Sequence, residues 1–257
     1  MPTSDLLMKE LSDDESITFY FARGYIDSQP PQWLEEQLEG PPHLRFLQWD
    51  LTLLDTIYQN HLEKYGAPTR KLESMPSIDV VEKQREDDEL LGSFFGSTFV
   101  NDVLEPWSVG VALEYLHNII DDEGPFHGVV GVSEGAAVAA TLLVEDIQHC
   151  KAMQARSDFR CALFYVGSPA LSEDGMRIMH SDTDGQVINI PTCHIMGEND
   201  IFKKGSDELL KLCDSDKALT ITDLGGHRIP QDMGTNKQVA DWIREQERHL
   251  IDEQVAR

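Results

Sequence analysis

The residue best suited to nucleophilic chemistry in this chain is Ser133, the central serine of the run 131–135 (GVSEG). The G-x-S-x-G pattern is weak by itself, because composition alone would produce it in about one chain in ten. Its context strengthens it, since an apolar run precedes the serine and a run of small residues, 136–140, follows it. A serine on a tight turn between a strand and a helix needs small neighbours, and it presents its Oγ where helix amides stabilise developing negative charge. We therefore expect Ser133 to be a nucleophile, with a purely structural turn as the alternative.

An activated serine needs a histidine that accepts its proton and a carboxylate that orients the histidine. In chains with such a turn, the order along the sequence is serine, acid, histidine. Asp200 fits the acid, because it ends the run 195–200 (IMGEND) directly after an apolar stretch. Glu198 and Asp184 compete with it, and the position at the end of the expected strand favours Asp200. The structural alternative for Asp200 is a turn or helix-capping residue.

His227 fits the histidine of this set. It follows an apolar run, 219–224, and two glycines whose freedom lets the backbone present a ring over the strand ends. The chain has nine histidines, so histidine content alone singles out none of them. His180 and His194 are the alternatives, but His194 lies inside an expected strand, which favours a role in the core.

Side chains so far apart in sequence meet only if a sheet brings the ends of its strands together. Apolar runs alternate with helical patterns, which favours a largely parallel sheet with helices on both faces. The length of 257 residues fits a single domain, 1–257. The expected strands are 17–22, 44–49, 126–132, 161–166, 192–196 and 219–224. The expected helices are 30–38, 51–65, 107–120, 134–144, 206–212 and 236–254.

A weaker signal covers residues 66–99. This stretch contains a charged run, 82–89 (EKQREDDE), and then becomes rich in glycine, serine and phenylalanine. Its position between expected core elements favours a lid or substrate loop, and a disordered loop is the alternative.

The charge balance limits the partners. The chain has 46 acidic and 21 basic side chains and a formal charge of −25. This field repels phosphate backbones, so we expect no nucleic-acid partner. It also slows anionic substrates unless a carrier protein or a local basic pocket delivers them, although an acidic surface serves solubility alone equally well.

The remaining features indicate a protein of the cytoplasm that works without a cofactor. No apolar run is long enough to span a bilayer, and the first residues lack the basic and apolar regions of a secretory signal. The four cysteines show no C-x-x-C spacing, so we expect reduced thiols. Neither a metal-binding histidine pair on a helix nor a glycine-rich phosphate loop is present, so we expect no metal and no nucleotide.

Three segments together resemble the FSH-type serine hydrolases: 124–137 around the serine, 190–200 around the acid and 225–230 around the histidine. The resemblance extends over roughly 107–242 and is faint before that. It implies an α/β-hydrolase fold with a mostly parallel central sheet, helices on both faces and a lid or loop insertion. It also implies carboxylesterase or thioesterase chemistry by Ser133, Asp200 and His227. Many fungal members of the family serve polyketide pathways, where they release or trim an acyl chain.

Two positions depart from the family pattern. Arg23-Gly24 stands where the family usually has His-Gly, and Glu134 stands where it usually has glutamine. Both flank the expected oxyanion hole, which the Glu134 amide and an amide near Gly24 and Tyr25 would form. Because a lone carboxylate beside a forming oxyanion opposes catalysis, we hypothesise that Arg23 pairs with Glu134 and tunes the site. Two independent surface changes are the alternative.

The leading functional prediction is a serine hydrolase that cleaves an ester or thioester of an acyl or polyketide-like small molecule in a fungal secondary-metabolite pathway. The substrate would arrive free or on a carrier protein. One alternative is a cyclase, lyase or isomerase that uses the same pocket without an acyl intermediate, motivated by Arg23 and Glu134. Another is a catalytically silent binding module.

Overall fold

The computed structural model describes residues 5–11, 17–30, 35, 41–52, 55–56, 59 and 104–255. Nearly all of the expected helices 30–38 and 51–65, and the whole of the expected lid or substrate loop 66–99, lie outside the described residues.

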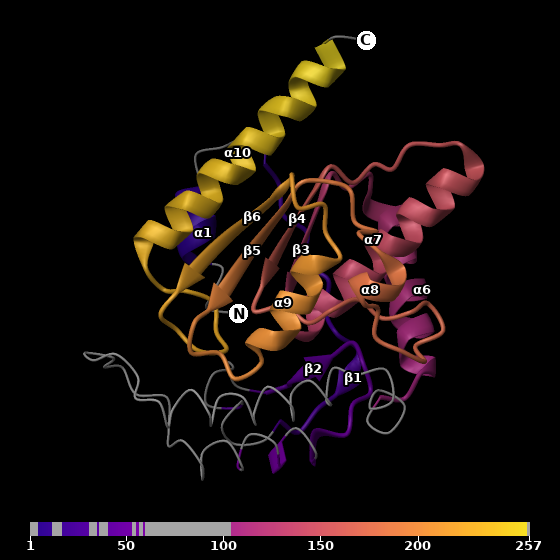
Figure 1. Ribbon diagram of the computed structural model, residues 1–257, viewed down its shortest axis with the longest axis vertical. Helices are drawn as coiled ribbons and strands as arrows, with labels where there is room; N and C mark the ends of the chain where they lie inside the picture. The colour runs from indigo at the N-terminus through magenta and orange to yellow at the C-terminus, as the bar shows by residue number, and fades with distance from the viewer. Residues whose placement is uncertain are drawn as a thin grey trace.

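The centre of the described chain is a sheet of parallel strands in the spatial order β3-β4-β5-β6 (Figure 1). Long apolar runs form it because its inner strands are covered on both faces, and every residue of β5 is buried. Each strand lies within two residues of its expected position, which confirms these four predictions. The strands are β3 (Gly128–Val132), β4 (Cys161–Tyr165), β5 (Thr192–Gly197) and β6 (Ala218–Asp223).

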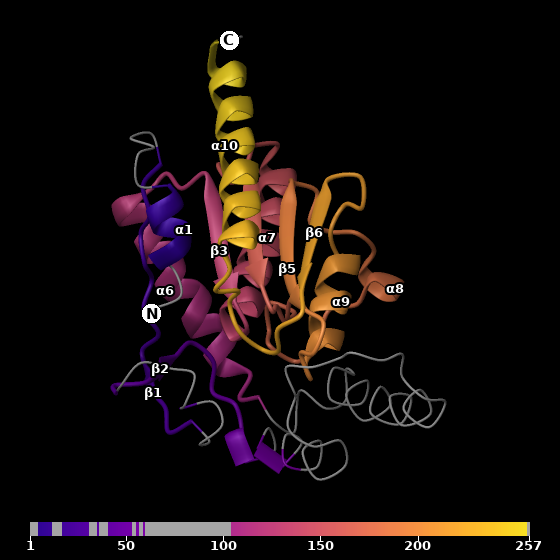
Figure 2. The same ribbon diagram turned by 90° about the vertical axis from the view of Figure 1, so that its left-hand side faces the viewer.

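Helices cover both faces of this sheet, because alternate strand residues point to opposite sides. On one side Phe164 of β4 lies in an apolar cluster with residues of α6 (Trp107–Glu123), α7 (Glu134–Met153) and α9 (Lys203–Lys211). On the other side Leu163 of β4 lies in a cluster with residues of α1 (Asp5–Glu10) and α10 (Met233–Val255). Figure 2 shows α10 in front of the sheet and α7 behind it.

Four expected helices correspond to α6, α7, α9 and α10, and α7 is longer than expected. Residues 145–153 continue α7 because they contain no glycine or proline, and the helix ends before Gln154, whose φ of 53° is left-handed. The sequence did not predict α1 or the single turn of α8 (Ser181–Asp184).

The predictions for the two first strands are wrong in part. Residues 17–22 join no ladder of the described chain, although Ile17 and Phe19 pack against the same cluster as Val132 of β3. The apolar residues Ile17 and Phe19 of this run are therefore partly buried by side-chain packing rather than by pairing of the backbone. The backbone pairs further along, where β1 (Ile26–Asp27) and β2 (Leu44–Arg45) form an antiparallel pair of two residues each.

The parallel strand order, with helices on both faces, is the α/β-hydrolase arrangement that the family resemblance implies. Across the residues that the structure describes, no helix is long and apolar enough to cross a membrane.

Candidate active site

Ser133 occupies the sharp turn between β3 and α7. It has φ 53° and ψ −117°, which lie in a region that residues other than glycine rarely adopt. Two backbone hydrogen bonds hold the turn: Ser133 N–H donates to the Tyr165 carbonyl at 2.9 Å, and Ala136 N–H donates to the Ser133 carbonyl at 3.0 Å. Strained backbone held in place by its surroundings is typical of functional sites.

The two glycines of the 131–135 motif have different structural roles. A Cβ on Gly131 would lie 2.5 Å from the Cα of Ala136, so only glycine permits this approach of strand and helix. A Cβ on Gly135 would meet nothing within 4 Å. The sequence prediction that small residues are needed at the turn therefore holds for Gly131, whereas no described neighbour requires a glycine at position 135.

The structure brings Ser133, His227 and Asp200 into one hydrogen-bonded group, which we call the serine group. The Oγ of Ser133 lies 2.7 Å from Nε2 of His227. The Nδ1 of His227 lies 3.0 Å and 2.9 Å from the two carboxylate oxygens of Asp200. These residues follow β3, β6 and β5, whose carboxyl ends meet at one edge of the sheet (Figure 1).

The burial of this group suits a proton relay. The side chain of Asp200 is 1% exposed and that of His227 is 12% exposed, so solvent reaches the imidazole but hardly reaches the carboxylate. A carboxylate at Nδ1 favours the tautomer that carries its proton there, which leaves Nε2 free to accept the proton of Ser133.

Asp200 also shapes the turn that leads into α9. Its Oδ1 accepts a hydrogen bond from the Phe202 amide at 2.8 Å, and its carbonyl accepts one from the Lys203 amide at 3.0 Å. The Phe202 ring in turn stands edge-on to the imidazole of His227, with 5.0 Å between the ring centres. The turn-forming role named as an alternative for Asp200 therefore coexists with its contact to His227.

Gly197, at the end of β5, allows the loop of His227 to approach. A Cβ there would lie 2.4 Å from the Gly226 carbonyl oxygen. The contact is reinforced by the Asn199 amide, which donates to the Gly225 carbonyl at 2.9 Å. Sequence reasoning attributed this freedom to glycines 225 and 226 and missed Gly197, although the glycine that follows the apolar run was a visible signal.

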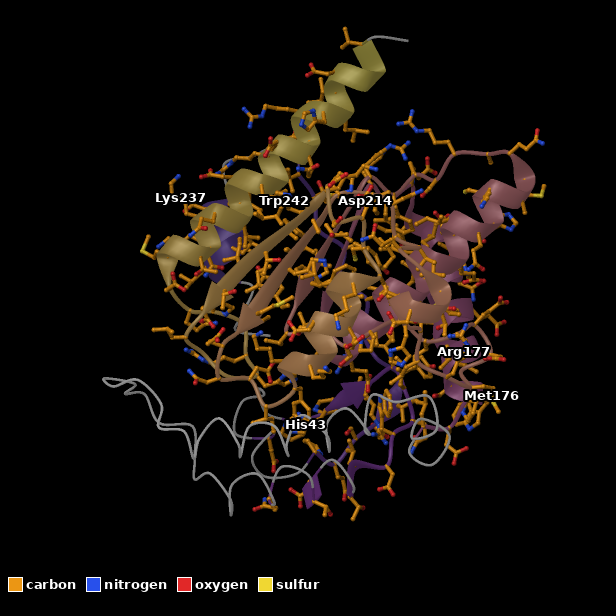
Figure 3. The ribbon with its side chains drawn as sticks, viewed as in Figure 1. His43, Met176, Arg177, Asp214, Lys237 and Trp242 are labelled. Atoms are coloured by element: carbon orange, nitrogen blue, oxygen red, sulfur yellow. The ribbon has the colours of Figure 1, made fainter. Side chains whose placement is uncertain are left out.

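The two competing acids lie outside the serine group. Glu198 is exposed, and its amide donates to the Asp223 carbonyl at 2.8 Å. Asp184 is bound by Arg177, whose two terminal nitrogens lie 2.8 Å and 2.6 Å from its oxygens; Figure 3 labels this arginine. The Arg177 hydrogen bonds lower the pKa of Asp184 to about 2, so this carboxylate is engaged in a stable ion pair.

The two competing histidines also have partners elsewhere. The Nδ1 of His180 lies 3.6 Å from a carboxylate oxygen of Glu208. His194 is buried in β5, with Nε2 at 3.1 Å from the Thr192 hydroxyl and its ring against Phe164. Burial lowers the pKa of His194 to about 4, which keeps it neutral as expected of a core residue.

The predicted pairing of Arg23 with Glu134 is wrong. The carboxylate oxygen Oε1 of Glu134 instead accepts hydrogen bonds from two successive amides, Phe46 at 2.8 Å and Leu47 at 3.2 Å. The cation that acts on Glu134 is Arg45. Arg23 is exposed and forms no ion pair with any described residue. The amides that bind Glu134 directly follow β2, and the side chain of the 17–25 segment that interacts with it is Tyr25 rather than Arg23.

The carboxyl group of Glu134 is unusual electrostatically. Burial raises its pKa to about 7, against the lowering effect of the Phe46 and Leu47 amides and of Arg45. It therefore changes charge near neutral pH, one residue from Ser133.

The backbone amides predicted for the oxyanion hole differ in their hydrogen bonding. The Glu134 amide begins α7, and no acceptor within the described part of the chain binds it. The Tyr25 amide donates to the Arg45 carbonyl at 3.1 Å, so this amide already has an acceptor, and the donor expected near Gly24 and Tyr25 stays a prediction. Gly24 packs so tightly on the Arg45 backbone that a Cβ would lie 2.6 Å from it, and a role for its amide stays a prediction.

Outside this site the described residues offer no second centre of comparable chemistry. They contain no group of three histidine, cysteine, aspartate or glutamate side chains able to hold a metal ion. A hollow of about 800 Å³ lies between the last turns of α7, the loop after it and α10, and no member of the serine group lines it.

Known proteins resemble this chain in the region that contains the site. Esterase FPY3 of Fusarium mangiferae is 30% identical over 125 residues, which cover 48% of this chain and 57% of that protein. Family of serine hydrolases 2 of Saccharomyces cerevisiae is 28% identical over 139 residues, which cover 52% of this chain and 59% of that protein. The chain therefore spans little more than half the length of these curated relatives.

Among solved structures, the carboxylesterase of Bacillus cereus aligns with 57% of this chain and 65% of its own, at 15% identity and a TM-score of 0.38. The family model described as Serine hydrolase (FSH1) matches residues 58–239, well over half of the chain and the whole of the 131–135 motif, Asp200 and His227. The chain belongs to the FSH1 family of serine hydrolases.

Proposed function

We propose that this chain is an esterase that cleaves an ester or thioester of an acyl substrate through a covalent intermediate on Ser133. The observation that carries the proposal is the 2.7 Å contact of the Ser133 Oγ with Nε2 of an imidazole whose other nitrogen is bound by Asp200. Membership of a serine hydrolase family and relatives named as esterases support it.

In the acylation half-reaction, the Ser133 Oγ attacks the carbonyl carbon of the substrate while Nε2 of His227 takes its proton. Asp200 stabilises the imidazolium that forms, because its carboxylate lies against Nδ1 in a nearly dry position. The oxyanion of the tetrahedral intermediate would bind at the start of α7, where the Glu134 amide and the helix dipole favour negative charge. The intermediate collapses as His227 protonates the leaving alcohol or thiol.

In the second half-reaction, water attacks the acyl-enzyme and His227 takes its proton. The same nitrogen then returns this proton to the Ser133 Oγ as the acid leaves. Each cycle consumes one ester or thioester and one water and yields one acid and one alcohol or thiol, so no cofactor is needed for the balance.

The proposed substrate is a neutral acyl ester, or an acyl thioester delivered on a carrier. The chain carries a formal charge of −25, which disfavours a free anionic substrate by long-range repulsion. Fungal relatives named as esterases support extending the proposal to a polyketide-like acyl chain of a fungal secondary-metabolite pathway. The proposed setting is the cytoplasm.

The test is the loss of turnover in Ser133→Ala. With p-nitrophenyl butyrate and a butyryl thioester as substrates, we expect kcat/KM to fall by about 10³-fold or more, because no nucleophile remains. A fluorophosphonate probe should label the wild-type chain at Ser133 and leave the variant unlabelled. Equal turnover in both proteins would refute the proposal.

Two observations favour this proposal over the competing functions. The non-hydrolytic alternative was motivated by Arg23 and Glu134, and the Glu134 carboxylate binds the Phe46 and Leu47 amides instead of Arg23. The silent binding module required a serine, histidine and aspartate that fail to meet, whereas the distances between them are those of hydrogen bonds.

A further inference from the structure

Glu134 connects two segments that are far apart in sequence. Its backbone begins α7 directly after Ser133, whereas its Oε1 accepts the amides of Phe46 and Leu47 at 2.8 Å and 3.2 Å. Both bonds run between a carboxyl oxygen and backbone, so they fix the position of the main chain rather than that of a mobile side chain.

The segment held in this way contacts the residues around Gly24. Gly24 packs directly on the backbone of Arg45, and the Tyr25 amide donates to the Arg45 carbonyl at 3.1 Å. Leu47 follows two residues later and is fully buried. The Glu134 carboxyl group therefore links the turn of Ser133 to the segment that carries Gly24.

We propose that Glu134 is a positioning residue, whose carboxyl group fixes the segment 45–47 and the Gly24 backbone relative to Ser133 and whose ionisation slows the attack of the serine. This inference rests on the proposed esterase function and concerns the regulation of the same site by pH.

The surroundings of Glu134 explain why it ionises near neutral pH. The titratable and charged side chains that interact with it are Arg45 of β2 and Tyr25 just before β1, together with a hydrogen bond from the Trp49 indole. Burial outweighs the favourable effect of Arg45 and the amides and raises the pKa of Glu134 to about 7. The carboxyl is thus neutral in mildly acidic solution and charged in mildly alkaline solution.

The two forms of Glu134 differ in charge but hardly in their bonds to the backbone. A protonated carboxyl still offers its carbonyl oxygen to the amides of Phe46 and Leu47. The ionised form adds a negative charge one residue from the place where the oxyanion develops, and like charges repel strongly in a site of low dielectric constant. Reactivity should therefore fall as the pH rises and Glu134 ionises.

The experiment measures the labelling rate of Ser133 by a fluorophosphonate probe from pH 5.5 to 9 on the full chain. In that reaction the Ser133 oxygen bonds to phosphorus, fluoride leaves, and the serine proton passes through His227 to solvent. We expect the wild-type rate to fall about tenfold from near neutral pH to pH 9. Glu134→Gln keeps an acceptor for both amides and cannot ionise, so its rate should not fall above pH 7.

Two further variants separate position from charge. Glu134→Ala removes the acceptor, so we expect slower labelling at every pH and faster hydrogen exchange of the Phe46 and Leu47 amides. Both amides should stay protected in Glu134→Gln. Glu145→Gln, on the same helix and paired with His117, is the matched control and should follow the wild-type profile.

The outcomes distinguish this inference from the function on which it rests. Absence of labelling of the folded wild-type chain at every pH would overturn the esterase proposal and the inference with it. Normal labelling with the same alkaline fall in wild type and Glu134→Gln would overturn the inference alone, and this comparison stands even where Glu134→Ala does not fold. Unchanged exchange of the two amides in a folded Glu134→Ala would overturn the positioning role.

Discussion

The two sides of the active site are built differently. On one side, Asp200 and His227 follow β5 and β6, and their loops are joined through Gly197, Asn199 and Gly225 by backbone contacts. On the other side, the described residues that face the start of α7 include two short strands, β1 and β2, of two residues each. The carboxyl group of Glu134 holds the second of these segments by bonds to two amides.

The general base and the expected oxyanion hole are therefore held in place by different kinds of contact. Asp200 and His227 are positioned by a sheet whose strand β5 is fully buried, so their geometry follows from the fold. The other side of the active site depends on individual polar contacts. Among its described groups, Glu134 has a pKa near neutral pH and therefore changes charge there. Substitutions on the two sides should therefore have different signatures, and the expected effects below run from the largest to the smallest.

Asp200→Asn should have the largest effect on the serine group while leaving the fold intact. An asparagine oxygen can still accept the Phe202 amide, now bonded to Oδ1 at 2.8 Å. It cannot stabilise an imidazolium, so we expect kcat for ester hydrolysis to fall by roughly 10³- to 10⁴-fold. Steady-state kinetics and a thermal melt of the same sample measure the two quantities.

The matched control for this change is Asp184→Asn, which removes a carboxylate from the ion pair with Arg177 outside the serine group. We expect its kcat to stay within about twofold of wild type, with a loss of stability of about 1 kcal/mol. An Asp200→Asn protein as active as this control would show that Asp200 does not serve His227.

The two glycines of the 131–135 motif test how far the turn of Ser133 depends on the close packing of β3 against α7. Gly131→Ala would place a methyl group 2.5 Å from the Cα of Ala136, so β3 and α7 must separate. We expect a loss of about 2–3 kcal/mol in the free energy of unfolding and a fall of roughly 10²-fold in kcat, because Ser133 moves with the turn.

Gly135→Ala has the same chemistry but an open position, since a Cβ there meets nothing within 4 Å. In the first turn of α7 this alanine should raise the free energy of unfolding by up to about 1 kcal/mol. Urea unfolding compares the two variants. Equal destabilisation by both substitutions would contradict the different structural roles assigned to Gly131 and Gly135.

The difference between the two sides of the active site also explains which features the sequence could predict. The strands β3 to β6 were found because each is an apolar run between helical patterns, and burial on both faces demands such a run. Ser133, Asp200 and His227 were found because each follows one of these strands, so the sheet that reveals itself in the sequence also positions them.

The other side could not be derived in this way. The run 17–22 has the composition of a strand, yet Ile17 and Phe19 are partly buried without backbone pairing, and composition does not distinguish the two cases. The partners of Glu134 are backbone amides, which every residue except proline carries, so no side-chain pattern marks Phe46 or Leu47. Arg23 was predicted as the partner of Glu134 because it departs from the family pattern, whereas the arginine that acts on Glu134 is Arg45.

The stability of the protein should depend on pH through Glu134. Its pKa is raised in the folded chain from an ordinary value of 4.5 to about 7, so the unfolded chain releases this proton first. The contribution is therefore complete below pH 4.5 and is lost as the pH rises to about 7, with a magnitude of up to about 3 kcal/mol. Glu134→Gln cannot ionise, so it lacks this pH-dependent contribution to the free energy of unfolding. Urea unfolding at pH 5, 6, 7 and 8 should show wild type losing stability relative to the variant, and a constant difference would contradict the raised pKa.

Arg23→Ala should have the smallest effect of all, although the residue departs from the family pattern next to the expected hole. Its side chain is exposed, and the carboxylate proposed as its partner is bound by backbone amides instead. Removing an exposed guanidinium that forms no ion pair with a described residue should change the free energy of unfolding by less than about 0.5 kcal/mol and kcat/KM for a neutral ester by less than about twofold. Steady-state kinetics with a neutral and an anionic ester provide the measurement. A loss confined to the anionic ester would assign Arg23 to substrate binding. A loss of kcat with both esters, as expected for Glu134→Ala, would instead show that Arg23 helps to position the oxyanion hole. That result would contradict the assignment of this role to Glu134 without Arg23.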